Sequence, residues 1–162
     1  MIEYPKYKKV LFCTDFSENA DYAFEFAYGI AKRDEGVLYI LHVTPGNPQE
    51  LLIEKFLPEH IKETMRRVIE KDVVTNYKKH YVERIMDSIP FKVITKSGRA
   101  DEEIIECAKR ENVDLIIIGT HGETGIERVF FGSVAEKVLR RSSIPVFLIP
   151  CKKKLEYSYG DI

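Results

Sequence analysis

The chain has 162 residues, of which 44% are hydrophobic and 31% are charged, and its 25 basic and 26 acidic residues give a formal net charge of −1. This composition is typical of a folded globular protein and argues against a disordered chain, and no apolar run is long enough to cross a bilayer. Because the net charge is close to zero, nothing attracts the chain as a whole to nucleic acid or to anionic lipid. We therefore expect neither nucleic acid nor a membrane as a partner.

The cellular compartment can be predicted from the N-terminus and the cysteines. Residues 1–6 carry no apolar signal core, which predicts a cytoplasmic protein. Cys13, Cys107 and Cys151 are odd in number and far apart in the sequence, a pattern that fits unpaired thiols in a reducing compartment. No pair of cysteines or histidines has the spacing of a structural metal site, so we expect no metal bound by the protein alone.

The first elements are a strand, a helix and a second strand. Val10–Cys13 is a short apolar strand, and Ser17 is a candidate N-cap for the helix that follows. Apolar residues then recur at helical spacing: Ala20, Ala23, Phe24, Ala27, Ile30 and Ala31. Val37–Val43 is apolar almost throughout, which suits a strand that is covered on both faces in a parallel sheet.

A long helical pattern follows a break rich in proline and glycine at residues 45–48. It runs from about Glu59 to Met86, and its periodicity predicts one buried apolar face. The positions of this face are Ile61, Met65, Val68, Ile69, Val73, Tyr77 and Tyr81. Residues 49–57 form either a separate helical turn or a flap, and the role of residues 46–60 stays open.

The second half repeats the alternation. Strands are predicted at Phe91–Thr95, Leu115–Ile118 and, between two prolines, Val146–Ile149. Asp101 is a candidate cap for the helix between the first two of these strands. A last helix, from Ser133 to about Arg141, is predicted to bury three residues: Val134, Val138 and Leu139.

Strands and helices alternate along the whole chain, which predicts an α/β fold of three layers. We expect an open, Rossmann-like sheet of about five mostly parallel strands flanked by helices, in a single domain over residues 1–150, with a polar tail at 151–162. Ligands of such folds bind beyond the carboxyl ends of the strands, where the strand order reverses. Asp15, Val43, Gly98 and Gly119 all fall at or just past predicted strand ends.

The most informative motif begins at the end of the 115–118 strand. Gly119-Thr120-His121-Gly122 is followed, after nine intervening residues, by Gly132-Ser133 at the start of the last helix. Glycines let a backbone approach a phosphate closely, and a helix N-terminus offers it N–H groups and a positive dipole end. The P-loop pattern and the dinucleotide pattern G-x-G-x-x-G after the first strand are both absent.

In the order of its motifs the chain resembles the universal stress protein family, in its ATP-binding branch. Residues 10–17 resemble the first strand and acidic turn of the family, and residues 41–43 resemble the end of its second strand. Residues 118–134 and 144–146 resemble its C-terminal signature. The resemblance covers residues 6–150 and implies the adenine nucleotide α-hydrolase-like version of the fold.

The resemblance also implies a role for each matching residue. Asp15 would accept hydrogen bonds from ribose or adenine, and the other residues would surround the base, the ribose and the phosphates. Thr14 and Val43 would flank the base, Ile118 would pack on the adenosine, Gly119 and Gly122 would let the loop wrap the ligand, and Gly132, Ser133 and Val134 would bind phosphates. Cys13 departs from the family, since some nucleotide-binding relatives have proline there. Thr120, His121 and Arg128 complete the candidate set.

Some residues keep two interpretations. His121 contacts phosphate or points to solvent, and Arg128 reaches a triphosphate or is an ordinary solvated charge. His42, inside an apolar strand, is better explained as a hydrogen-bonded core histidine than as a catalyst.

The resemblance implies a regulatory stress-response protein that binds ATP or AMP, with Mg²⁺ or Mn²⁺ held through the nucleotide phosphates. We expect little or no hydrolysis, because no group near the glycine loop has a partner that would make it a convincing catalyst. The alternatives are a slow ATPase and a nucleotide-free interaction module of the same fold.

The last strand predicts a partner. We expect an apolar strand at the edge of the sheet, formed by Val146, Phe147, Leu148 and Ile149, and unprotected apolar edges tend to pair. The resemblance implies a homodimer joined through this strand.

Overall fold

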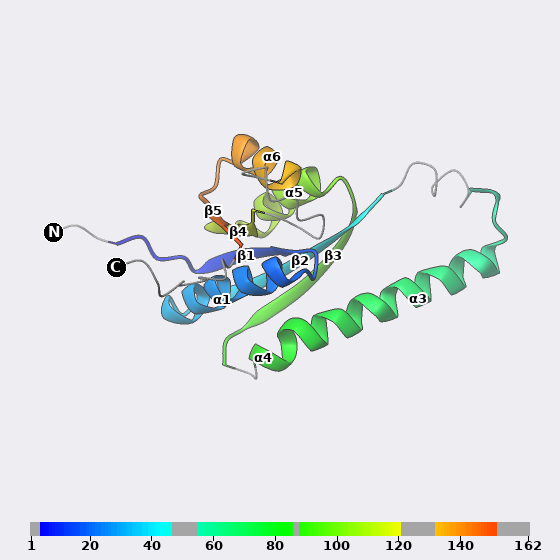
Figure 1. The fold of residues 1–162 in the computed structure, drawn as a ribbon, viewed down its shortest axis with the longest axis horizontal. Coiled ribbons are helices and arrows are strands. Elements are labelled where there is room, and N and C mark those ends of the chain that lie inside the picture. The colour runs from blue at the N-terminus through cyan, green and yellow to red at the C-terminus, as the bar shows by residue number, and fades with distance from the viewer. Residues whose placement is uncertain (1–3, 47–54, 86–87, 121–131, 152–162) are drawn as a thin grey trace, which may run out of the picture.

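The computed structural model describes residues 4–46, 55–85, 88–120 and 132–151. It contains a five-stranded parallel sheet with the strand order β3-β2-β1-β4-β5 (Figure 1). The strands are β1 (Lys9–Thr14), β2 (Val37–Pro45), β3 (Phe91–Gly98), β4 (Leu115–Gly119) and β5 (Val146–Ile149). The predicted parallel α/β fold is confirmed, and β2 and β3 both extend a few residues beyond their predicted ends.

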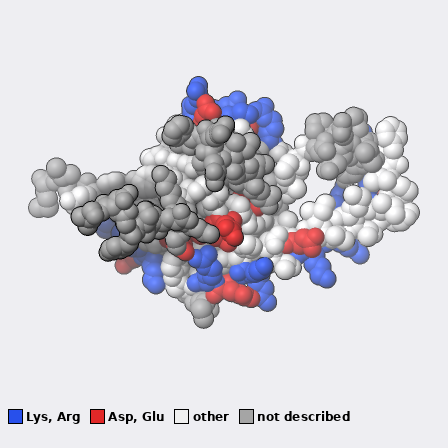
Figure 2. Space-filling model, in the orientation of Figure 1, with Lys and Arg blue, Asp and Glu red and all other residues white. Residues whose placement is uncertain are grey.

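Helices cover both faces of the sheet. The helical elements are α1 (Glu18–Arg33), α3 (Glu59–Tyr77), the π-helical turn η1 (Lys78–Val82), α4 (Glu83–Ile85), α5 (Ala100–Glu111) and α6 (Ser133–Arg141). One core lies between the sheet and α1, η1 and α4, and a second lies between the sheet and α5 and α6. In the part of the face that Figure 2 describes, acidic and basic side chains lie beside one another at the upper and lower edges of the view.

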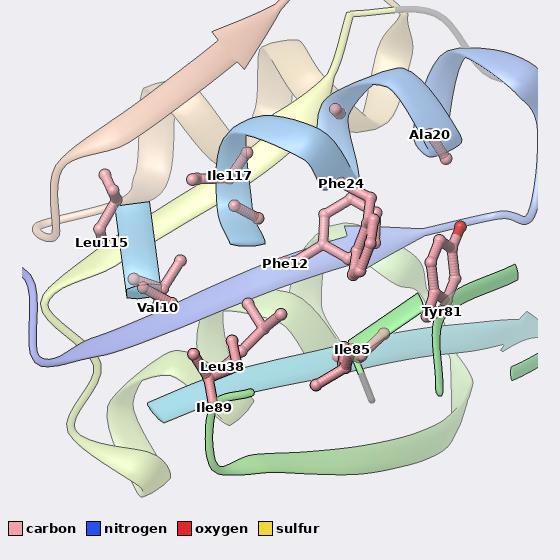
Figure 3. Packing of buried hydrophobic residues seen from close by; sticks show 14 of the residues in the cluster. Val10, Phe12, Ala20, Phe24, Leu38, Tyr81, Ile85, Ile89, Leu115 and Ile117 are labelled. Carbon is pink, nitrogen blue, oxygen red and sulfur yellow. The ribbon is translucent and has the colours of Figure 1, made fainter. Parts of the chain in front are cut away.

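Alternate residues of the central strands enter the two cores. In β1, Val10 and Phe12 pack toward α1 and η1, whereas Leu11 and Cys13 pack toward α5 and α6. The fully buried ring of Phe12 lies against Phe24 and Tyr81, with centroid distances of 5.7 and 5.3 Å (Figure 3). Both faces of these strands therefore need apolar side chains, which explains the unbroken apolar runs in the sequence.

The helix after β1 begins as predicted. The Ser17 side chain accepts a hydrogen bond from the N–H of Ala20 at 3.2 Å and so caps α1. The cap satisfies one N–H group at a helix end that opens toward the carboxyl edge of the sheet.

The prediction of one buried face along the long helix is wrong for its N-terminal part. Tyr77 and Tyr81 are buried, but α3 extends away from the sheet (Figure 1), and Met65 is 51% exposed. The other exposed members of the predicted face are Ile61, Val68 and Ile69. Residues four apart advance about 40° around a helix at each step, so the ridge from Ile61 to Tyr77 turns by about 160°. Its two ends therefore face different directions.

Two smaller predictions about the last helices are also wrong. Arg99, not Asp101, occupies the N-cap position of α5. Asp101 lies buried in the first turn, where its carboxylate binds Arg141 at 2.8 Å and Arg99 at 3.3 Å, since these cations compete with the backbone for it. In α6, Val138 is buried as predicted, but Leu139 is 46% exposed because Ala135 and Val138 form the inner face.

Among the helices that the structure describes, none combines the length and the apolar character needed to cross a membrane.

Candidate functional site

A cavity of about 390 Å³ lies at the carboxyl edge of the sheet. The chain places β2 and β3 on one side of β1 and then β4 and β5 on its other side, so the strand order reverses between β1 and β4. The ends of both strands line the cavity, together with the end of β2 and the starts of α5 and α6. This is the position at which open α/β sheets bind ligands.

The structure brings together every predicted site residue that it describes. Those that line the cavity are Cys13, Thr14, Asp15, Val43, Ile118, Gly119, Thr120, Gly132, Ser133 and Val134. His121, Gly122 and Arg128 lie outside the described residues. The lining shows where the residues lie, whereas their roles toward a ligand stay predictions.

Six further lining residues were not predicted: Ala20, Leu41, Pro45, Ala100, Ile104 and Ala135. They are apolar, so they carry no chemical signal in the sequence. Two patterns could have found some of them: Leu41 and Pro45 flank Val43 at strand spacing, and Ala100 and Ile104 are four residues apart at a helix start.

The turn after β1 holds Asp15 through its neighbours. The Oδ1 atom of Asp15 accepts hydrogen bonds from the N–H and hydroxyl groups of Ser17, at 3.1 and 2.5 Å. Phe16 has a φ of +62°, which is uncommon for a residue with a large side chain. Its N–H donates to Thr14 Oγ1 at 2.8 Å. Side chains on both sides of Asp15 therefore stabilise this backbone conformation.

The N-terminus of α6 forms the opposite wall. Gly132 is its N-cap, with no side-chain cap, and its N–H donates to the Thr120 carbonyl at 2.6 Å. The first intrahelical bond runs from Glu136 N–H to Gly132 O at 3.0 Å. The N–H groups of Ser133, Val134 and Ala135 precede that bond, so within this helix they have no acceptor, and all three residues line the cavity.

The cavity is mostly apolar, and Asp15 is the one charged side chain among its described lining residues. Burial raises the pKa of the Cys13 thiol, which keeps it protonated and a poor nucleophile. The described residues hold no cluster of three or more His, Cys, Asp or Glu that could bind a metal ion.

His42 lies behind the cavity wall. Its Nδ1 atom is 2.9 Å from the Thr14 carbonyl, and its ring is 4.5 Å from that of Phe16. These contacts agree with the predicted hydrogen-bonded histidine, although His42 is half-buried and not a core residue.

Comparisons with known proteins point to the same family as the sequence motifs of residues 10–17 and 118–134. The model of the universal stress protein family matches residues 6–150. Universal stress protein MJ0577 of Methanocaldococcus jannaschii is 34% identical over 160 residues, which cover 90% of this chain and 96% of the relative. Universal stress protein MJ0531 of the same organism is 32% identical over 156 residues, which cover 91% and 85% of the two chains.

Solved structures show the same fold. The structure of MJ0577 superposes with a TM-score of 0.74 at 29% identity and covers 92% of this chain and 99% of that one. Universal stress protein UspA from Lactobacillus plantarum gives a TM-score of 0.62 at 26% identity, with coverage of 90% and 99%.

Proposed function

We propose that this chain, which belongs to the universal stress protein family, binds an adenine nucleotide, ATP or AMP, in the cavity at the carboxyl edge of its sheet. Occupancy of the site would then be the regulatory signal. The observation that carries the proposal is the N-terminus of α6, which has no side-chain cap and opens on the same cavity as Asp15.

The two walls suit the two ends of a nucleotide. Val43 and Ile118 offer apolar surface to a planar base, and Asp15 offers carboxylate oxygens to ribose or adenine hydrogen-bond donors. At the opposite wall, the N–H groups of Ser133 and Val134 and the positive end of the helix dipole suit phosphate oxygens. The volume of about 390 Å³ falls in the usual range for small-molecule sites.

We propose that Mg²⁺ or Mn²⁺ enters with the nucleotide. The described lining residues include no basic side chain, so we expect a triphosphate to need a cation to offset its own repulsion. We also propose a cytoplasmic protein, since Cys13, Cys107 and Cys151 are all free thiols.

We expect ATP and AMP to bind with micromolar affinity, with Mg²⁺ required for ATP but not for AMP. Isothermal titration of the purified protein with each nucleotide, with and without EDTA, measures this directly. The absence of heat, together with no competition against a fluorescent adenine nucleotide, would exclude the proposal.

We also propose a homodimer joined through β5. In the described sheet this strand pairs with β4 on one side. Phe147 on this strand is 39% exposed, and the centroid of its ring lies 5.8 Å from that of Tyr7. We expect a dimer in sedimentation velocity and a monomer after Phe147→Lys, because a buried lysine disfavours the paired edge. Phe26→Lys is the matched control, since Phe26 on α1 is 41% exposed and should leave the dimer intact. A wild-type monomer at high concentration would contradict the proposal.

A further inference from the structure

Two tyrosines at the junction of α3 and η1 reach the strand ends that form the cavity wall. Tyr77 is the last residue of α3, and Tyr81 lies in the π-helical turn four residues later. Both are buried in the core between the sheet and α1, on the side opposite α5 and α6. They therefore reach the strand ends of the site from the face of the sheet that lies opposite α5 and α6.

Tyr81 holds the turn that carries Asp15. Its hydroxyl shares a hydrogen bond of 2.5 Å with Thr14 Oγ1, in the buried interior. The same Thr14 oxygen accepts the N–H of Phe16, the residue with φ of +62°. A left-handed backbone at a bulky residue persists only where its surroundings hold it. The Tyr81 hydroxyl thus fixes the threonine that fixes the turn.

Tyr77 acts in the same way on β2. Its hydroxyl accepts the N–H of His42 at 2.9 Å and donates to the Ile94 carbonyl at 2.6 Å. In the parallel register His42 pairs with Thr95, so these two backbone groups face each other across β2 and β3. The tyrosine bridges the two strands one residue before Val43, which lines the cavity.

Packing alone does not require these hydroxyls. The centroid of the Tyr81 ring lies 4.7 Å from that of Phe24 and 5.3 Å from that of Phe12, and neither of these rings carries a polar atom. A phenyl ring would fill the same space without the cost of burying a hydroxyl. Burial also raises the pKa of Tyr77 to about 12, so this hydroxyl keeps its proton at physiological pH.

We propose that Tyr81, assisted by Tyr77, is a positioning residue for the nucleotide site, which holds the Thr14–Ser17 turn so that Asp15 faces the ligand. The inference rests on the proposed function. It assigns the π-helical turn a role in ligand binding from the far side of the sheet, in keeping with the frequent occurrence of such turns at functional sites.

The test is a double-mutant cycle between Tyr81→Phe and Asp15→Asn, with ATP and Mg²⁺ titrated calorimetrically into each variant. We expect Tyr81→Phe to weaken ATP binding about tenfold. We expect the double variant to bind no more weakly than Asp15→Asn alone, because Tyr81 acts through Asp15. Tyr28→Phe is the matched control. The hydroxyl of Tyr28, a residue of α1, bonds Ser88 at 2.8 Å, so its removal should leave the ATP affinity unchanged.

The outcomes separate the two proposals. If the wild-type protein and Tyr81→Phe bind ATP equally, the positioning role is wrong and the proposed function stands. Additive losses in the double variant also overturn the positioning role. A merely structural hydroxyl would lower the melting temperature without changing ATP affinity. If the wild-type protein binds no nucleotide, the proposed function fails and the inference fails with it.

Discussion

The Gly132→Val protein is expected to fold normally and to lose ATP binding by at least about a hundredfold. Gly132 has φ of −65° and ψ of 152°, an extended conformation that valine adopts without strain. The isopropyl group, however, occupies the wall of the cavity beside the N–H groups of Ser133 and Val134, where we place the phosphates. Calorimetric titration with ATP and Mg²⁺ measures the loss, and a circular dichroism melt checks the fold.

A second glycine provides the control. Gly29 lies inside α1, and a Cβ atom built on it has no neighbour within 4 Å. Gly29→Ala should therefore stabilise the protein by about 0.5–1 kcal/mol and leave ATP binding unchanged. Undiminished binding in Gly132→Val would show that the phosphates bind elsewhere.

The Phe12→Ala protein is expected to lose about 3–5 kcal/mol of its free energy of unfolding. Phe12 is fully buried between Phe24 and Tyr81, and alanine leaves a cavity that the central strand β1 cannot close by moving. The loss is a large share of the stability of an ordinary domain. Equilibrium unfolding in urea, without nucleotide, measures it.

Phe26→Ala is the comparison for this experiment. Phe26 is 41% exposed on α1 and contacts the ring of Tyr22 at 5.2 Å. Its removal should cost about 1 kcal/mol or less, as is usual for surface positions. Equal losses for the two variants would mean that β1 does not form the centre of the core.

The sequence predicts the sheet well because burial on both faces leaves a direct mark. The runs at residues 10–13 and 115–118 are apolar throughout, and both are central strands. Periodicity is less informative for α3, because it shows which residues share a ridge but not whether another element lies opposite. The exposure of Met65 therefore could not be predicted.

The site shows the same division. Asp15, Gly119 and Gly132 could be predicted because a charge or a glycine at a strand end is unusual enough to attract attention. Ala100 and Ile104 could not be predicted, since they contribute only apolar surface to the shape of the cavity. The contact between Thr14 and Tyr81 joins residues 67 positions apart, and no local pattern marks it.

The long projection of α3 would act as a lever if the helix pivots about its buried last residue, with the fulcrum at Tyr77. Glu59, at the far end, is 18 residues away (77 − 59), a distance of about 27 Å along the helix axis. A rotation of only about 10° at the fulcrum moves that end by about 5 Å. At the fulcrum, the Tyr77 hydroxyl bonds His42 and Ile94 of the two neighbouring strands. A pivot too small to change the shape of the cavity would thereby become a movement that a pair of distance labels can measure.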